Sequence, residues 1–212
     1  MIGQRRRSAA SRRRSALRGR RERGAVLVET ALILPMLLMI ALAVLDLGLA
    51  WRASMTVTSA ARAGARVSSN LGTSWSTDRN ALMSIDAALG AIDNGDVVAI
   101  SIFRSSSADG TVPPACITAS ARSAGGNAAA RCNTYTGADL GNVGALSFPS
   151  SCSGRHQFYC PSTRQNRQGA VGGPDYVGVY VEIAHPTMTR LFGSTMSISE
   201  TAVMRVEPNA GA

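Results

Sequence analysis

The distribution of apolar and polar positions divides the chain into three parts. Residues 1–24 are basic and almost without apolar side chains, residues 25–69 are mostly apolar or small, and residues 70–212 mix short alternating patterns with turns. A long apolar run that continues into small residues predicts one extended helix. The alternating patterns predict a small antiparallel sheet, so the expected fold class is α+β, with a long N-terminal helix ahead of a sheet-containing module.

The third part is expected to begin with a helix and to continue with strands. Thr77 and Asp78 can cap a helix over residues 79–89, which Gly90 would end. Three strand patterns follow at residues 97–103, 176–184 and 196–207. Alternation gives two of these strands an apolar face, formed by Val177, Val179, Val181 and Ile183 in one and by Ile198, Ala202, Met204 and Val206 in the other. Three strands packed on the emerging helix would bury only a thin core.

The apolar run from Ala25 to Trp51 is long enough to span a membrane, yet it contains two carboxylates. Spanning roughly 30 Å of hydrocarbon takes about 20 helical residues. Only 16 residues separate Glu29 from Asp46, and they cover roughly 24 Å at about 1.5 Å per residue. At least one carboxylate therefore lies at or inside the hydrocarbon boundary, where a charge costs on the order of 3 kcal/mol.

The net charge of +9 belongs to the N-terminal segment. Ten Arg and one Glu lie within residues 1–23, whereas the rest of the chain carries twelve Arg and twelve carboxylates. A polybasic segment directly before an apolar run keeps the N-terminus cytoplasmic and sends the C-terminal part across the membrane. We expect this leader to be disordered in water. Because the remainder is neutral, we expect no nucleic-acid partner.

Glu29 has no basic neighbour one helical turn further on, because Leu32 and Ile33 occupy those positions. Cleavage after Gly24 would create a positively charged α-amino group on Ala25, four residues before this carboxylate. Glu29 could then pair with that amine, in its own chain or in a neighbouring subunit.

Small side chains recur in residues 47–69, at Ala50, Ser54, Ala60, Ala61, Gly64 and Ala65. Such spacing allows close approach of a second helix, although an alanine-rich composition gives the same pattern. Arg62 and Arg66 lie one turn apart and form a basic stripe that is either solvated or faces carboxylates of the C-terminal module.

The basic leader, Gly24, Glu29 and the long apolar helix together resemble the class III signal of type IV pilins and pseudopilins. More specifically, residues 23–66 resemble the TadE-like family, the minor pilin-like proteins of tight-adherence (Tad/Flp) pili. The matching landmarks are Gly24, Glu29, Pro35, Asp46–Gly48 and Ala60–Arg66. Thr30 stands where this family usually has an aromatic residue, and Ala63 stands where it commonly has an acidic one.

This resemblance implies a minor pilin-like subunit without enzymatic activity or cofactor. A prepilin peptidase would cut between Gly24 and Ala25, and Glu29, Pro35 and Asp46 would take part in subunit assembly. The implied partners are that peptidase, other pilins, the platform proteins of the inner membrane and membrane lipid. The protein would cross the cytoplasmic membrane once, with its N-terminus cytoplasmic and residues 70–212 extracytoplasmic, and could be incorporated in a pilus.

Residues 105–175 are rich in Gly, Ser, Asn and Ala, and they contain all four cysteines of the chain. A bare loop of this length is unusual in a compact domain. An even number of cysteines on the exported side of a membrane indicates disulfides. Of the three possible connectivities, we favour the sequence-local pairs Cys116–Cys132 and Cys152–Cys160.

Three alternatives compete with this interpretation. His156 lies between Cys152 and Cys160, but the cysteine spacings match no common zinc site and no metal is expected. The residues Ser11–Arg14 faintly resemble a twin-arginine signal, and cleavage near Ala43 would give a secreted protein, such as an enzyme. An uncleaved chain would be an ordinary bitopic membrane protein whose external module binds a ligand. The common hydrolase, nucleotide-binding and metalloprotease motifs are missing from the sequence.

Overall fold

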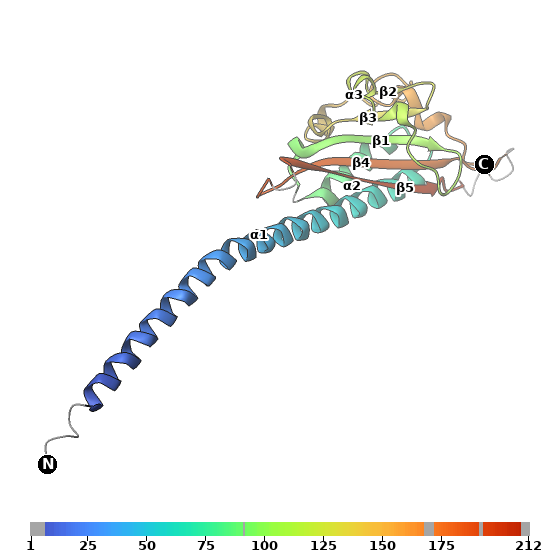
Figure 1. Ribbon diagram of the computed structural model, residues 1–212. Helices are drawn as coiled ribbons and strands as arrows, with labels where there is room; N and C mark the ends of the chain where they lie inside the picture. Colours follow the sequence, from blue (N-terminus) through green and yellow to red (C-terminus); the bar gives the residue numbers. More distant parts are fainter. Residues whose placement is uncertain (1–6, 91, 168–171, 191–192, 209–212) are drawn as a thin grey trace, which may run out of the picture. The chain divides into compact units, whose positions relative to one another are not determined.

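A computed structural model describes residues 7–90, 92–167, 172–190 and 193–208, with side chains from Val26 onward. The chain divides into two units, Met1–Leu47 and Gly48–Ala212, and helix α1 (Arg7–Leu71) contributes residues to both (Figure 1).

Helix α1 begins earlier than the sequence pattern predicts. We expected disorder up to Gly24, but the helix already includes the basic residues from Arg7 onward. Alanine and arginine are strong helix formers, and residues 7–18 contain neither glycine nor proline. The C-terminal end at Leu71 lies within two residues of the expected end at Ser69.

The second unit contains a five-stranded sheet in which all pairings are antiparallel. Its strand order is β2–β3–β1–β4–β5. The strands are β1 (Val97–Ser105), β2 (Gly126–Asn127), β3 (Cys132–Tyr135), β4 (Tyr176–Pro186) and β5 (Thr195–Arg205). The three predicted strands are therefore confirmed, and the expectation of a three-stranded sheet is wrong. The two additional strands come from the cysteine-containing region, where two- and four-residue strands are too short to give a periodic signal.

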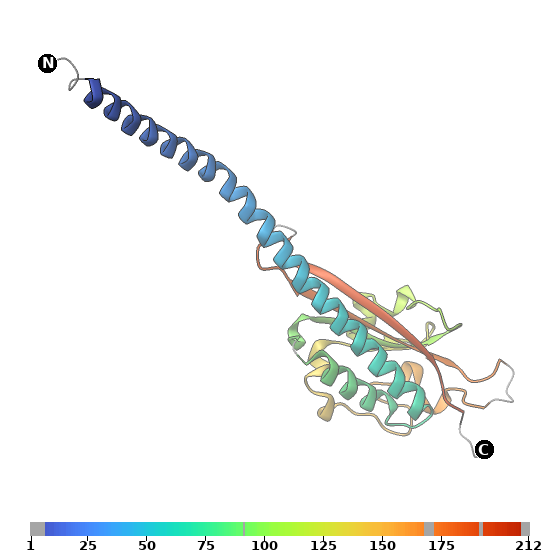
Figure 2. The same ribbon diagram turned by 90° about the horizontal axis from the view of Figure 1, so that it is seen from below.

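One face of the sheet is covered by two helices, namely the part of α1 from Gly48 onward and helix α2 (Thr77–Leu89) (Figure 2). The apolar faces predicted for the strands point to this side. Val177, Val179, Val181 and Ile183 of β4 are fully buried. In the edge strand β5, Ile198, Ala202 and Met204 are partly buried against the same core. The α+β fold expected from the sequence is thus confirmed.

Small residues let α1 approach the sheet and α2 closely. Ala60, Ala61 and Ala65 are at most 1% exposed. A Cβ atom added to Gly64 would lie 2.6 Å from Cδ1 of Ile85 in α2 and 3.3 Å from Cγ1 of Val179 in β4. The close approach expected from the small-residue spacing therefore occurs within the module, between α1, α2 and β4.

The opposite face of the sheet has a smaller apolar cluster around Phe103 and Tyr180. Phe103 lies directly over Gly178 of the neighbouring strand, where an added Cβ would come within 2.2 Å of its ring. The disulfide between Cys116 and Cys132 belongs to this cluster. A covalent link thus replaces the apolar side chains that this region of the sequence lacks.

The region 105–175 is folded into short elements joined by turns. Its two disulfides, Cys116–Cys132 and Cys152–Cys160, are the two sequence-local pairs favoured from the sequence. The short helices of the module are η1 (Asn94–Asp96), η2 (Pro114–Cys116), α3 (Ala119–Ala124), α4 (Gly137–Leu140), η3 (Val143–Ala145), η4 (Gln157–Tyr159) and η5 (Pro161–Thr163).

The close packing of Gly64 is testable by a matched pair of substitutions. Gly64→Ala places a methyl group against the buried Ile85 side chain, and we expect overpacking to lower the free energy of unfolding by about 1–2 kcal/mol. Gly48→Ala adds the same methyl group where no atom lies within 4 Å, so it should be neutral or stabilise by up to about 1 kcal/mol. Thermal unfolding of the full chain in detergent measures both, and equal effects would contradict this packing.

Candidate functional site

The apolar part of α1 exposes its side chains. Leu27, Leu32 and Val44 are 70%, 74% and 67% exposed. Val26–Leu71 contains an apolar stretch that is almost entirely unburied. A helix with this much uncovered apolar surface is not the core helix of a soluble domain. It is long and apolar enough to cross a membrane once, as expected for a single-pass membrane protein.

Glu29 lies on this exposed apolar helix. Among the residues whose side chains the structure describes, no basic group lies within ion-pair distance of its carboxylate. The neighbouring hydroxyl of Thr30 donates to the carbonyl oxygen of Val26, 2.8 Å away, so its hydrogen bond is made within the helix. The expected cleavage site, Gly24 and Ala25, lies outside the described side chains, so pairing of Glu29 with a new α-amino group stays a prediction.

The other two residues expected to act in assembly differ from Glu29. Pro35 lies inside α1, where it has no N–H to donate to the carbonyl of Ala31, yet the helix continues past it. Such prolines are tolerated in membrane-spanning helices. Asp46 is only 4% exposed and is not without a partner. The two carboxylates of the apolar run are therefore in different environments, and Glu29 is the exposed one.

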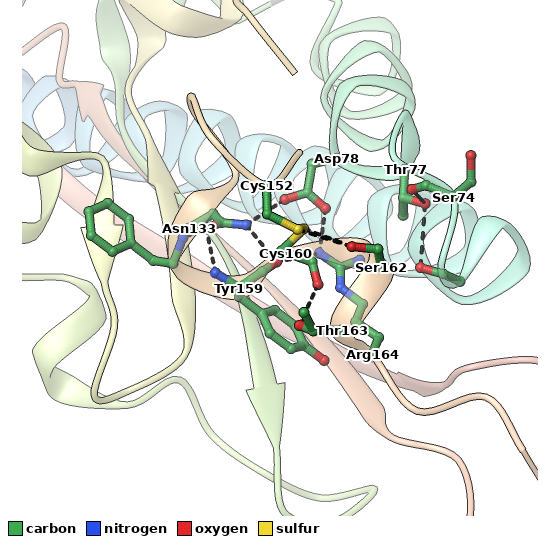
Figure 3. A network of polar contacts seen from close by, with 12 residues as sticks. Ser74, Thr77, Asp78, Asn133, Cys152, Tyr159, Cys160, Ser162, Thr163 and Arg164 are labelled. Carbon is green, nitrogen blue, oxygen red and sulfur yellow. Dashed lines mark hydrogen bonds and ion pairs between the residues drawn. A yellow bond between two sulfur atoms is a disulfide. The ribbon is translucent and has the colours of Figure 1, made fainter. Parts of the chain in front are cut away.

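The module beyond α1 contains a buried polar network that joins three segments (Figure 3). At its centre, Nη2 of Arg164 lies 2.5 Å from Oδ1 of Asp78, and both side chains are fully buried. The other oxygen of Asp78 accepts hydrogen bonds from the Asn133 amide at 2.7 Å and from the Tyr135 hydroxyl at 3.1 Å. The carboxylate on α2 is thereby linked to strand β3 and to the segment after η5.

Asn133 extends this network to the loop closed by the second disulfide. Its amide group donates to the carbonyl oxygen of Tyr159 at 3.0 Å, and its side-chain oxygen accepts from the backbone N–H groups of Phe158 and Tyr159. Arg164 donates to the same carbonyl at 3.2 Å and places its guanidinium 4.4 Å from the centroid of the Tyr159 ring. These contacts fix the backbone of η4 against the sheet.

The titratable groups around Asp78 are held in their neutral forms. Burial, together with the adjacent Asp78 carboxylate, raises the pKa of Tyr135 well above its ordinary value. Burial also raises the pKa of Tyr159 to about 12 and lowers the pKa of His156, whose ring stacks on Phe148. A fully buried carboxylate with three donors and protonated phenols beside it has no access to a substrate. The network is therefore structural.

Sequence reasoning missed this network because it assigned Asp78 to a helix cap. The N-cap of α2 is Ser76, and its side chain makes no capping hydrogen bond. The Thr77 hydroxyl instead donates to the carbonyl of Ser74 at 2.6 Å. The signal was present in the spacing, because Asp78 shares a helical face with the buried residues Leu82 and Ile85 and must find a partner in the core.

The two cysteines that flank His156 in the sequence form a disulfide. Cys152 and Cys160 are bonded to each other and cannot supply thiolate ligands. Over the part of the chain that the structure describes, no three His, Cys, Asp or Glu side chains are grouped closely enough to hold a metal ion.

A polar cleft of about 500 Å³ lies beside the start of β4. Its main charges neutralise each other, because the guanidinium of Arg104 donates twice to Oδ1 of Asp175, at 3.0 and 2.8 Å. Oδ2 of the same carboxylate accepts from the backbone N–H of Gln165 at 2.9 Å. The ion pair and the hydrogen bond thus link the segments that line the cleft to one another.

Two tyrosines test the assignment of the polar network. Tyr135→Phe removes a hydrogen bond to a buried carboxylate, and we expect a loss of about 1.5–3 kcal/mol in the free energy of unfolding. The hydroxyl of Tyr159 is buried without a hydrogen-bond partner, so Tyr159→Phe should change it by less than about 0.5 kcal/mol. Denaturant unfolding of the full chain in detergent at pH 7 measures both, and similar losses would contradict the assignment.

The raised pKa of Tyr159 predicts that the protein loses stability at alkaline pH. The pKa of Tyr159 rises from 10.0 to about 12 on folding, so the unfolded chain releases this proton first and stability falls as the pH increases through this range. Tyr159→Phe should reduce the loss of stability between pH 10 and 12.

Comparison with known proteins identifies one region of the chain. Residues 24–66 match the family model described as TadE-like protein. Comparisons with curated proteins and with solved structures find no match. The matched segment begins at Gly24, contains Glu29, Pro35 and Asp46, and ends on the part of α1 that packs against the sheet. Over these residues the chain is similar to TadE-like proteins, and this similarity on an apolar N-terminal helix indicates a membrane protein related to the tight-adherence pilus.

Proposed function

We propose that this protein is a minor pilin-like subunit that takes part in assembly of a tight-adherence pilus and is anchored in the cytoplasmic membrane by α1. The observation that carries the proposal is the TadE-like match over residues 24–66, which coincides with an exposed apolar helix. In this proposal a prepilin peptidase removes residues 1–24. The other partners are pilins and platform proteins of the inner membrane, and the role is structural, as is general for this family.

Charge and redox chemistry support the proposed orientation. The basic leader holds the N-terminus on the cytoplasmic side, and its removal leaves side chains that sum to zero net charge. The two disulfides lie in the module that follows the helix. Disulfides persist on the oxidising, exported side of a bacterial membrane, which supports an extracytoplasmic position for the C-terminal module.

Glu29 has a specific role in this proposal. An unpaired carboxylate near the hydrocarbon boundary costs on the order of 3 kcal/mol. The new α-amino group of Ala25 offers a positive partner after cleavage, in the same chain or in an adjacent subunit. Pairing between subunits would remove the cost only in the assembled state, and it would align the helices along their common axis.

The N-terminus of the protein tests the proposed processing. We expect the chain purified from its native membrane to begin at Ala25, which leaves 188 of the 212 residues. Intact mass and N-terminal sequencing measure this directly. An N-terminus at Met1 would instead support an ordinary bitopic protein, and one at Val44 would support a secreted protein.

The role of Glu29 is tested by piliation. Glu29→Ala should leave membrane insertion intact, because it makes the helix more apolar, while the number of pili per cell falls, because loss of about 1.4 kcal/mol weakens a subunit contact tenfold. Glu207→Gln removes an exposed carboxylate outside the helix and serves as the control. Membrane fractionation and electron microscopy give the two readouts. Normal piliation of Glu29→Ala would remove the proposed role.

A further inference from the structure

A groove of about 650 Å³ lies between α1 and α2 and is lined by exposed and half-buried residues. Besides hydroxyl side chains of both helices, its lining contains three apolar side chains and two arginines: Met55, Ala63, Val67, Arg62 and Arg66. Met55 is 64% exposed, although the opposite face of the same helix is fully packed. The groove is therefore an open, partly apolar channel along the outer face of α1.

The two arginines give this groove a positive charge that the module itself does not neutralise. Arg62 and Arg66 are exposed and lie one helical turn apart. Among the described residues between 48 and 208, no carboxylate forms an ion pair with Arg62 or Arg66. By contrast, Arg104, Arg155 and Arg164 each pair with an aspartate of the module. The groove arginines are thus left available for an external acidic group.

The distance of the groove from the apolar run argues against lipid headgroups as that group. Trp51, which is exposed, ends the apolar run and marks the membrane interface. Arg62 and Arg66 follow it by 11 and 15 residues, or roughly 16 and 22 Å along the helix at about 1.5 Å per residue. The headgroup layer is only about 5–8 Å thick on each side. Both arginines therefore lie beyond the headgroup layer.

A second copy of this chain in parallel is also a poor occupant. Two copies anchored at the same depth would bring their own Arg62 and Arg66 to the same height, and like charges at that separation repel. The complementary surface is a helix that carries two carboxylates one turn apart and small or apolar residues between them.

We infer that the groove between α1 and α2 binds an acidic helix of a different membrane-anchored subunit. Arg62 and Arg66 pair with carboxylates of that helix, and Met55, Ala63 and Val67 contact its apolar side chains. This inference deepens the proposed function, since it takes from it the anchoring of α1 in a membrane with other subunits. It adds the chemistry of the partner and the surface that holds it.

Photo-crosslinking of the full chain in its native cells tests the inference. Benzoylphenylalanine replaces Ser59, an exposed residue in the groove, and as a control it replaces Thr201, an exposed residue of the edge strand β5. We expect the Ser59 position to yield a crosslinked peptide from another chain, next to a membrane-spanning segment and with carboxylates one turn apart. The Thr201 position should not yield that peptide.

Charge variants show whether the arginines hold the partner. The double variant Arg62→Glu and Arg66→Glu should reduce the Ser59 crosslink at least tenfold, whereas Arg62→Lys and Arg66→Lys should retain most of it. Both side chains are exposed, and the intact disulfides and an unchanged unfolding temperature verify the fold. In membranes of the parent chain, the crosslink should also decrease as ionic strength rises, a readout that needs no variant.

Several outcomes would overturn the inference. In the crosslinking experiment, these are a Ser59 crosslink to lipid or to a second copy of this chain, no crosslink at Ser59, or an equal yield of the same partner from Thr201. In the charge experiments, it is a crosslink whose yield does not change on charge reversal or with salt. Processing after Gly24 is measured in the same samples. A processed chain without the acidic partner overturns this inference alone, whereas an unprocessed chain with the crosslink overturns only the proposed processing.

Discussion

The buried ion pair between Asp78 and Arg164 is the interaction on which the C-terminal module depends. Transfer of each charge out of water costs several kcal/mol, and removal of one partner from such a pair costs about 3–5 kcal/mol because the other charge remains buried. Here the pair joins α2 to the segment that follows the Cys152–Cys160 disulfide, and Asn133 and Tyr135 add strand β3. Segments poor in apolar residues are therefore held by specific polar contacts and by covalent bonds, in place of a large core.

The packing of α1 against the sheet and α2 depends on a different constraint, namely the small size of the side chains on the inner face of α1. The inner face of α1 is built mainly from alanine and glycine, with Val57 as a larger buried residue, so the helix axis can come close to β4 and α2. The same helix has its large apolar residues exposed in the first unit and its arginines exposed on the outer face of the second. One continuous helix thus carries three surfaces of different chemistry, for a membrane, for its own sheet and, as we infer, for an acidic partner.

Local sequence patterns predicted the elements that are determined by their own residues. Strands β1, β4 and β5 alternate strongly, α2 has a glycine stop, and the apolar run is too long for a soluble helix, so each was found from its own residues. The cleavage and assembly roles of Gly24, Glu29, Pro35 and Asp46 stay predictions, and all four residues lie within the matched segment. The sequence did not supply the contacts of Asp78, because its partners Asn133 and Arg164 lie 55 and 86 residues away. The helical leader was missed because composition alone was taken to indicate disorder, although alanine and arginine both favour helix.

The C-terminal end of strand β5 and the residues after it are hydrogen-bonded to the end of α1, and this affects when the module can be completed during synthesis. The hydroxyl of Ser69 donates to the carbonyl of Arg205, 136 residues later in the chain, and the N–H of Glu207 donates to the carbonyl of Ser69. Synthesis at about 5–20 residues per second delivers those 136 residues in on the order of ten seconds. Until then the sheet has no β5 and the inner face of α1 has no complete cover, so the mature surface of this helix exists only on chains synthesised to their last strand.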